Sequence, residues 1–186
     1  DPKNFIYPGK AGYWQTGFPG GSHEYLVNKG NGGRDMDGRT LFFYLATVNT
    51  PAMALEIPGV GSQYAFSSRD GSGAYLNGSN TYKLNIPANP PAQKFWSFVV
   101  YDPQTRSMLQ TGEMPYPSKN NKRNADMVKN ADGSIDLYFG PQAPAGMEAN
   151  WVKTVPGKGW FGIFRLYGPG QEWFDRTWKL GDIEKV

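Results

Sequence analysis

The stretch KFWSFVVY, residues Lys94–Tyr101, decides the fold class of this 186-residue chain. Side chains of a β-strand point alternately to opposite faces, so Phe95 and Val99 share one face of this stretch. Trp96 and Phe98 then share the other face. Both faces are apolar, which is typical of a strand that is covered on both sides. The sequence therefore predicts a central strand with a layer packed against each of its faces.

Short strands separated by turn residues are predicted on both sides of this stretch. In Thr81–Ile86 the apolar residues alternate, so we expect Tyr82, Leu84 and Ile86 to point inward. Further strands are predicted at 64–69, 75–78, 107–111, 134–139, 151–155 and 160–167, with a polar surface loop over 115–131. About eight short strands with long connections predict a mainly-β fold, an antiparallel two-sheet sandwich of the jelly-roll type.

Two helices are predicted beside the strands. Asp37 is a candidate cap for a helix that runs to about Asn49 and is stopped by Pro51. Apolar residues cover most of its circumference, so we expect this N-terminal-side helix to be largely buried. A short C-terminal helix is predicted from Gln171 to Trp178.

The domain organisation follows from the same patterns. Residues 1–36 are rich in Gly, Asn and aromatic residues without a sustained period. We interpret them as an irregular segment and a candidate for the end of a preceding domain, and residues 37–186 as the β-sandwich domain. The chain begins with Asp1 and Pro2, and we interpret it as a piece of a longer protein.

Composition excludes several classes of site. The chain has no Cys, which excludes disulfides, thiolate chemistry and Cys-ligated metals, and it has a single histidine, His23. We therefore expect neither a metal nor a cofactor. No apolar run is long enough to span a membrane, and the net charge is only +3. The basic run over residues 119–129 has no interleaved aromatic residue for stacking on bases, so we expect no nucleic-acid partner.

Arg165 is the most informative polar residue. In a strand over 160–167 it shares a face with Phe161, Ile163 and Tyr167. A buried arginine without an anionic or hydrogen-bonding partner is unfavourable, which leaves two interpretations. Either Arg165 forms a structural ion pair with one of the nearby carboxylates, or its guanidinium binds a carboxylate or phosphate of a ligand. The candidates for the ion pair are Asp102, Asp136 and Glu148.

Asn150 and Trp151 form a second candidate ligand site. A Trp face beside an amide suits a sugar, because the ring packs on C–H groups while the amide binds hydroxyls. The alternative is a core Trp next to an Asn that binds turn backbone. Trp96, Tyr101 and Tyr167 complete the candidate ligand-binding residues.

Catalysis would depend on acidic residues. Asp70, Asp102 and Glu148 are the candidate acids or bases. The two aspartates lie in turn contexts, Asp70-Gly71 and Asp102-Pro103, where Asp is expected for turn geometry alone. Sequence spacing does not show which pair converges, so an enzyme and a binding domain both stay open.

Several segments of the chain form one ordered set of residues: Asp70, Gly73, Leu76, Gly78, Tyr82, Pro91, Phe95-Trp96-Ser97, Tyr101-Asp102, Asp132-Gly133-Ser134, Tyr138, Asn150-Trp151, Phe161, Arg165, Tyr167, Pro169 and Trp178. Taken together, they resemble a bacterial family known as domain of unknown function 1214. In that family the domain usually follows a second domain of unknown function, number 1254, and many members look exported. The resemblance implies a C-terminal β-sandwich of a longer, periplasmic or secreted bacterial protein, with its N-terminal domain as a partner.

The leading functional hypothesis combines these observations. We expect a ligand-binding β-sandwich for a carbohydrate-like or anionic small molecule. One alternative is part of a hydrolase or lyase whose active site is completed by the N-terminal domain. The other is a structural module between domains.

Overall fold

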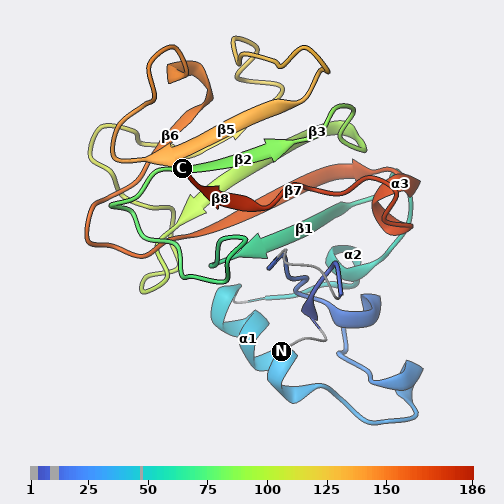
Figure 1. Cartoon of the computed structure of the whole chain (residues 1–186). Coiled ribbons are helices and arrows are strands. Elements are labelled where there is room, and N and C mark those ends of the chain that lie inside the picture. Colours follow the sequence, from blue (N-terminus) through green and yellow to red (C-terminus); the bar gives the residue numbers. More distant parts are fainter. Residues whose placement is uncertain (1–3, 9–12, 47) are drawn as a thin grey trace.

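The computed structural model describes residues 4–8, 13–46 and 48–186. Eight strands form two four-stranded sheets that pack face to face (Figure 1). The first sheet has the order β1 (Ser62–Ser67), β7 (Phe161–Pro169), β3 (Ala92–Tyr101) and β4 (Ser118–Asn120). The second has the order β6 (Trp151–Lys153), β5 (Ile135–Gly140), β2 (Tyr82–Ile86) and β8 (Ile183–Lys185). The predicted mainly-β sandwich is confirmed.

Strand β3 occupies the interior of the first sheet, as its two apolar faces predict. It pairs antiparallel with β7 on one side and with β4 on the other. The remaining pairs of the two sheets are antiparallel too, except that β5 and β6 run parallel.

The core lies between the two sheets. Phe98 of β3 and Phe164 of β7 are fully buried there, together with the predicted inward residues of β2. A large apolar side chain that is fully buried contributes about 1.5–3 kcal/mol to stability. Gly162 of β7 leaves room for the Phe98 ring, because a Cβ at that position would lie 2.2 Å from Phe98 Cζ. The sheet thus depends on a glycine at this point of close approach.

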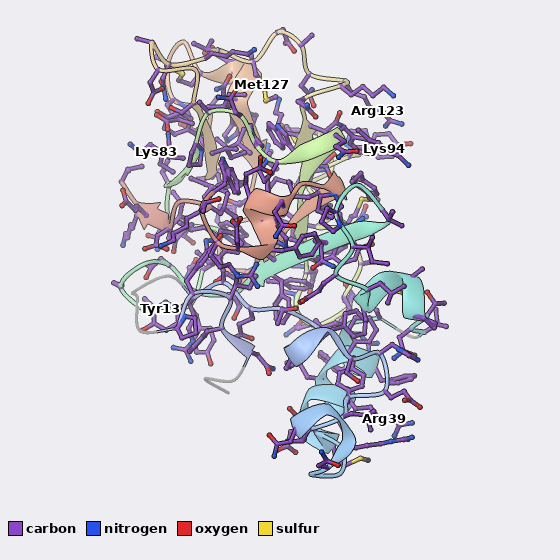
Figure 2. All side chains as sticks on the ribbon, turned by 90° about the vertical axis from the view of Figure 1, so that its right-hand side faces the viewer. Tyr13, Arg39, Lys83, Lys94, Arg123 and Met127 are labelled. Carbon is purple, nitrogen blue, oxygen red and sulfur yellow. The ribbon has the colours of Figure 1, made fainter. Side chains whose placement is uncertain are left out.

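Helix α1 (Met36–Leu45) differs from its prediction. It begins after Asp35, whose Oδ1 accepts a hydrogen bond from the Gly38 amide at 2.9 Å, and it ends four residues before Asn49. Only Gly38 and Phe42 of the helix are buried, so the expectation of a largely buried helix is wrong. Figure 2 shows the reason: the end of the molecule that carries Arg39 projects away from the sandwich. Only one side of the helix is therefore covered, and the rest faces solvent.

The other short elements also depart in detail from the predictions. Pro51 starts the helix α2 (Pro51–Ala54), because the fixed φ of proline suits a first helical turn. The C-terminal helix α3 is limited to Gln171–Phe174. Residues 107–111 contribute one bridge, from Met108 to Tyr101, whereas β4 lies inside the predicted surface loop. The 3-10 helices whose full bounds lie in the described residues are η2 (Pro19–Gly21), η3 (Asn28–Gly30) and η4 (Glu148–Asn150).

The segment before β1 contributes to two separate hydrophobic clusters. Ile6, Tyr7 and Trp14 belong to the core of the sandwich. A second cluster, which we call the edge cluster, consists of Phe18, Tyr25, Phe42 and Ala54, with Ala46 and Met53 packed against it. The assignment of residues 1–36 to the end of a preceding domain stays a prediction. In the part of the chain that the structure describes, no helix has the length and apolarity to cross a membrane.

Candidate functional site

Arg165 stands on the outer face of the first sheet. In β7 its neighbours Phe164 and Leu166 point into the core, so alternation directs Arg165 to the opposite side. The register places Tyr64 of β1 directly beside it on one flank and Ser97 of β3 on the other. The sheet itself therefore fixes where the cation lies.

The guanidinium of Arg165 has few protein partners. Its Nη2 donates a hydrogen bond to the Tyr101 hydroxyl, and its Cζ lies 5.7 and 5.8 Å from the ring centroids of Tyr64 and Tyr101. Its Nε is buried and has no hydrogen-bond acceptor among the described residues. Within the same residues Arg165 forms no ion pair. No carboxylate of the described residues balances the charge of this guanidinium, which is unfavourable unless an anion binds there.

The three carboxylates considered as structural partners for Arg165 are engaged elsewhere. Asp102 pairs with Lys158, whose Nζ lies 3.2 Å from Oδ2. Oδ1 of Asp136 accepts a hydrogen bond of 2.7 Å from the side-chain Nδ2 of Asn85. Glu148 is exposed and accepts one of 3.2 Å from its own loop. The structural ion pair expected as one alternative is therefore absent from the described residues.

Tyr101 adds a hydrogen-bond donor beside the cation. Burial raises the pKa of Tyr101, and the charge of Arg165 offsets part of that rise. The phenol is thus protonated at neutral pH. Its oxygen accepts from Arg165, so its own hydrogen is free to donate to an anion bound at the guanidinium.

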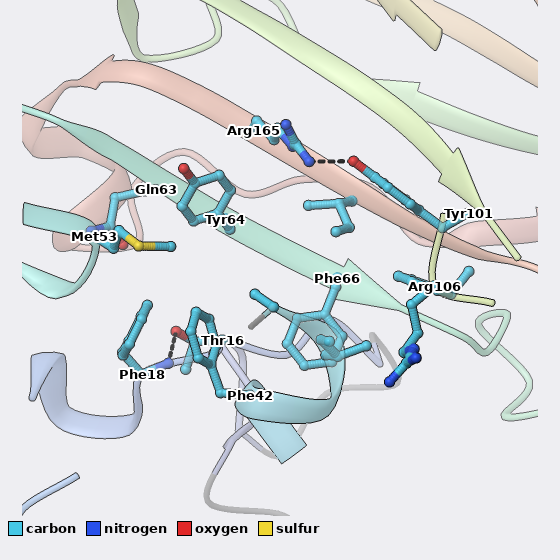
Figure 3. Close-up of a pocket in the computed structure, with 15 residues that line it drawn as sticks. Thr16, Phe18, Phe42, Met53, Gln63, Tyr64, Phe66, Tyr101, Arg106 and Arg165 are labelled. Atoms are coloured by element: carbon cyan, nitrogen blue, oxygen red, sulfur yellow. Dashed lines mark hydrogen bonds between the residues drawn. The ribbon is translucent and has the colours of Figure 1, made fainter. Parts of the chain in front are cut away.

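A cavity of about 240 Å³ opens in front of these groups (Figure 3). We call it the arginine cavity. It lies between the outer face of the first sheet and the edge cluster. Its polar lining consists of Thr16, Gln63, Tyr64, Tyr101, Arg106 and Arg165, and its apolar lining of Gly17, Phe18, Phe42, Leu45, Ala46, Met53, Phe66, Phe161 and Ile163. The described lining thus has two cations and no carboxylate.

Arg106 brings the second cation to the cavity. Its guanidinium lies 4.7 Å from the Tyr44 ring centroid and donates to the Tyr44 carbonyl at 3.3 Å. The Tyr44 hydroxyl in turn donates to the Pro103 carbonyl at 3.1 Å. These contacts join the end of α1 to the loop after β3 and hold the two sides of the cavity together.

The other candidate ligand residues lie apart from the arginine cavity. Asn150 is buried, and its side chain binds only backbone: Oδ1 accepts from the Val128 amide, while Nδ2 donates to the carbonyls of Val128 and Asp136. Trp151 is half-buried and its Nε1 donates to the Gly140 carbonyl at 3.0 Å. We leave both out of the proposed site.

Two further aromatic candidates serve other contacts. Trp96 points into the core and is 2% exposed. Tyr167 lies on the outer face, where its ring stacks on Phe95 with centroids 4.1 Å apart. Of the predicted ligand residues, the structure thus brings together Arg165 and Tyr101.

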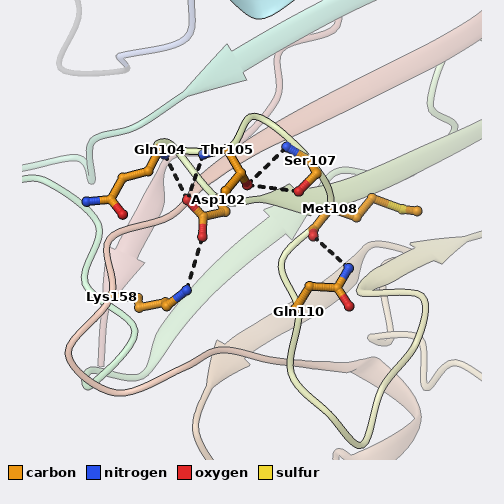
Figure 4. Close-up of polar contacts among 7 residues, drawn as sticks. All are labelled: Asp102, Gln104, Thr105, Ser107, Met108, Gln110 and Lys158. Atoms are coloured by element: carbon orange, nitrogen blue, oxygen red, sulfur yellow. Dashed lines mark hydrogen bonds and ion pairs between the residues drawn. The ribbon is translucent and has the colours of Figure 1, made fainter.

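The candidate acids each lie in a different loop. Oδ1 of Asp70 accepts from the amides of Ser72 and Ala74 and from the Ser72 hydroxyl, which closes a turn. Asp102 accepts from the amides of Gln104 and Thr105 at 2.8 and 3.2 Å and pairs with Lys158 (Figure 4).

These contacts set the titration of Asp102. Burial alone would raise its pKa, but the hydrogen bonds from Gln104 and Thr105 and the Lys158 cation hold that pKa below its ordinary value. The carboxylate is therefore charged at neutral pH, and its contacts are with its own loop and with Lys158. No group of three or more acidic or histidine side chains in the described ranges could hold a metal ion.

Sequence reasoning missed Tyr64 in the sheet and the whole part of the site that comes from outside the sheet. A signal for Tyr64 was available, because alternation in β1 puts it on the same face as Phe66. Arg106 and the lining residues of the edge cluster carry no such signal, since their positions depend on how α1 and α2 pack against the sheet.

Solved structures show where this fold occurs. The VPA0106 protein from Vibrio parahaemolyticus is similar in structure, with a TM-score of 0.60 and 22% sequence identity. The match covers 88% of this chain but 39% of the Vibrio chain, so this chain spans less than half of that protein. A putative uncharacterized protein from Burkholderia cenocepacia matches with a TM-score of 0.43 and 19% identity, over 73% of this chain and 31% of its own.

Sequence comparison connects the chain to a family. No curated protein matches it. Residues 61–171, which hold β1, β7 and β3 with Arg165 and Tyr101, match the family model described as protein of unknown function (DUF1214). That match spans more than half of the 186 residues and agrees with the resemblance carried by the sequence motifs, so the chain belongs to the DUF1214 family.

Proposed function

We propose that this domain binds a small amphipathic organic acid in the arginine cavity. The observation that carries the proposal is the guanidinium of Arg165, whose Nε is buried without an acceptor and which has no carboxylate partner among the described residues. A carboxylate or phosphate of a ligand would supply both the missing acceptor and the missing charge.

The remaining lining favours the kind of molecule that carries this anionic group. Phe42, Phe66 and Ile163 make much of the cavity wall apolar. Such a wall would leave the hydroxyls of a sugar without partners, whereas it suits an alkyl or aryl body. Of the two ligand classes that the sequence left open, the cavity therefore supports an anion with an apolar body better than a carbohydrate.

Binding, rather than turnover, is the activity that this lining supports. The described lining has no carboxylate or imidazole to act as acid or base, and Asp70, Asp102 and Glu148 hold their own loops. We therefore propose that the domain is the ligand-binding part of a longer protein. The family resemblance is what supports an exported protein, periplasmic or secreted.

Isothermal titration with octanoate and with its neutral isostere octanamide tests the proposal. We expect octanoate to bind at least about tenfold more tightly than octanamide, since a hydrogen-bonded charge at a partly buried site is worth more than a neutral amide. Arg165→Met should abolish that preference. Lys129→Met removes the same charge from an exposed loop and is the matched control, which should keep it. Equal binding of the two probes by the unaltered chain would overturn the proposal.

A second function, contact with another part of a longer protein, is favoured by a separate observation. Large apolar side chains between α1 and β1 are exposed: Met36, Leu41, Phe43, Tyr44, Val48, Leu55, Ile57 and Val60. Exposed apolar side chains mark an interaction surface where they form a contiguous patch, and the similar Vibrio protein is more than twice as long as its matched part. The test is hydrogen exchange on the full-length protein, in which α1 amides should be better protected than in this domain alone.

A further inference from the structure

A second cavity adjoins the arginine cavity. It has a volume of about 120 Å³, and we call it the polar cavity. It is lined by Phe5, Ile6, Thr16, Phe18, Pro19, Gly20, Glu56, Gln63, Tyr64, Trp173 and Arg176. Four of these side chains also line the arginine cavity, namely Thr16, Phe18, Gln63 and Tyr64. The two cavities are therefore neighbours that share one wall.

The shared wall includes Tyr64, which lies directly beside Arg165, and Gln63, the neighbour of Tyr64 in β1. Figure 3 shows Gln63 and Phe18 on the side opposite Tyr101 and Arg106. A molecule whose anionic group is held by Arg165 would extend its far end along the apolar wall toward Gln63. That far end would reach the polar cavity.

The polar cavity contains two opposite charges that are not paired with each other. Glu56 forms no hydrogen bond or ion pair with the described residues, and neither do Nε and Nη2 of Arg176. Nη1 of Arg176 donates to the Trp173 carbonyl at 2.6 Å, and its Cζ lies 5.5 Å from the Trp173 ring centroid. Arg176 is thereby oriented while most of its donors remain available.

Other groups of the wall keep a hydrogen to donate. The Thr16 hydroxyl accepts from the Phe18 amide at 3.2 Å, and the Tyr64 hydroxyl accepts from Ser62 Oγ at 2.6 Å. Each hydroxyl still has its own hydrogen for a further acceptor. The polar cavity thus offers both donors and acceptors next to the apolar wall of the arginine cavity.

This mixture decides which chemical group fits. A second carboxylate would be repelled by Glu56, and an ammonium group would be repelled by Arg176. A hydroxyl group avoids both problems, because it can donate to the carboxylate and accept from the guanidinium at the same time.

We infer that the ligand carries a hydroxyl group at the end opposite its acid group, and that Glu56 and Arg176 bind this hydroxyl in the polar cavity. The inference rests on the proposed function and makes it more specific. The ligand class is then a hydroxylated amphipathic organic acid, held at its acid end by Arg165 and at its far end by the polar cavity.

Titration with two matched series of acids tests this inference. The first series is hexanoate, octanoate and decanoate, and the second consists of their ω-hydroxy counterparts. For at least one chain length we expect the hydroxy acid to bind about tenfold more tightly than its parent, as a hydrogen bond to a charged group would give. Glu56→Ala should erase that difference while the affinity for the parent acid stays the same.

The control and the possible outcomes separate the two proposals. Glu184→Ala removes an equally exposed carboxylate from β8 and should leave the preference for the hydroxy acid intact. If the parent acids bind but no hydroxy acid is preferred, or if Glu56→Ala keeps the preference, the polar cavity is not a hydroxyl site and the proposed function stands. If no acid of either series binds, the proposed function fails and this inference fails with it.

Discussion

The two faces of the first sheet are made by the same strands and differ in how completely their side chains are satisfied. On the inner face Phe98 and Phe164 are fully buried in a continuous apolar core. On the outer face the Nε of Arg165 is buried and finds no acceptor in the part of the chain that the structure describes, and an open cavity lies in front of it. The successive residues Phe164 and Arg165 of β7 thus lie in opposite environments, one in a filled core and the other beside a cavity.

This difference indicates what each face contributes. The inner face is filled by groups that need no partner other than one another, which is how a core gains stability. The outer face keeps a charged group and empty volume, and both lower stability unless something binds there. We therefore expect substitutions on the two faces to separate stability from binding.

The largest effect is expected from Phe164→Ala on the inner face. Removing a fully buried ring leaves a cavity in the core, so the free energy of unfolding should fall by about 3–5 kcal/mol. Ile163→Ala, one residue away on the outer face, removes a half-buried side chain that already borders a cavity, so it should lower the free energy of unfolding by about 1 kcal/mol. Urea denaturation of both variants measures the two losses. Equal losses would contradict the contrast between the faces.

The next effect concerns Asn150, a buried polar residue whose groups are all satisfied. Asn150→Ala leaves the buried backbone partners at Val128 and Asp136 without hydrogen bonds. The free energy of unfolding should fall by about 3 kcal/mol, with octanoate affinity of the folded fraction unchanged. Loss of octanoate binding without loss of stability would return Asn150 to the ligand site.

A smaller effect is expected from Asp102→Asn. The amides of Gln104 and Thr105 can still bond to an Asn oxygen, and the Lys158 side chain is 51% exposed. The lost charge should therefore lower the free energy of unfolding by about 1 kcal/mol at neutral pH.

The pH dependence of this effect has a definite sign. The pKa of Asp102 is below its ordinary value of 3.8 in the folded chain, so folding favours the charged form. That contribution is present above the ordinary pKa and is lost as the pH falls through the lower, folded value. The difference between the unaltered chain and Asp102→Asn should therefore shrink as the pH falls below about 4. A difference that grows in acid would contradict the assigned contacts.

The sequence predicted the sheet more fully than the site, for a physical reason. Alternation in one strand is a local property, so it correctly put Trp96 and Phe98 on one face of β3 and grouped Arg165 with Phe161 and Ile163 on one face of β7. It did not show which face of each strand points into the core. The partner of Arg165 depends on distance across the sheet. Tyr101 stands opposite Phe161 in the register, and its long side chain reaches back along the strand to the guanidinium.

The cavity and the helix depend on packing that no local pattern encodes. The apolar circumference of α1 predicted burial, but Phe42 is the one large side chain of the helix that is buried, because the sandwich is on one side of it. The hydrogen bonds of Asn150 connect it to Val128, which is 22 residues away in the chain. A contact between residues so far apart in the chain depends on how the intervening loop folds, which no local pattern encodes.

The smallest stability effect is expected at the residue with the largest effect on binding, Arg165. Arg165→Met removes a charge that has no ion-pair partner among the described residues, and it keeps an unbranched apolar side chain beside Tyr64 and Tyr101. The hydrogen bond to Tyr101 and the cation–π contacts with Tyr64 and Tyr101 are lost, while the desolvation of the guanidinium is relieved, so the losses and the gain nearly cancel. We expect the free energy of unfolding to change by less than about 1 kcal/mol. A rise in stability would show directly that desolvation of Arg165 costs more than its contacts return. Octanoate protects the unaltered chain against thermal unfolding if it binds the folded state, and it should not protect Arg165→Met. A large loss of stability without ligand would mean that Arg165 stabilises the fold. The outer face would then contribute to stability as the inner face does, and the contrast between the two faces would fail.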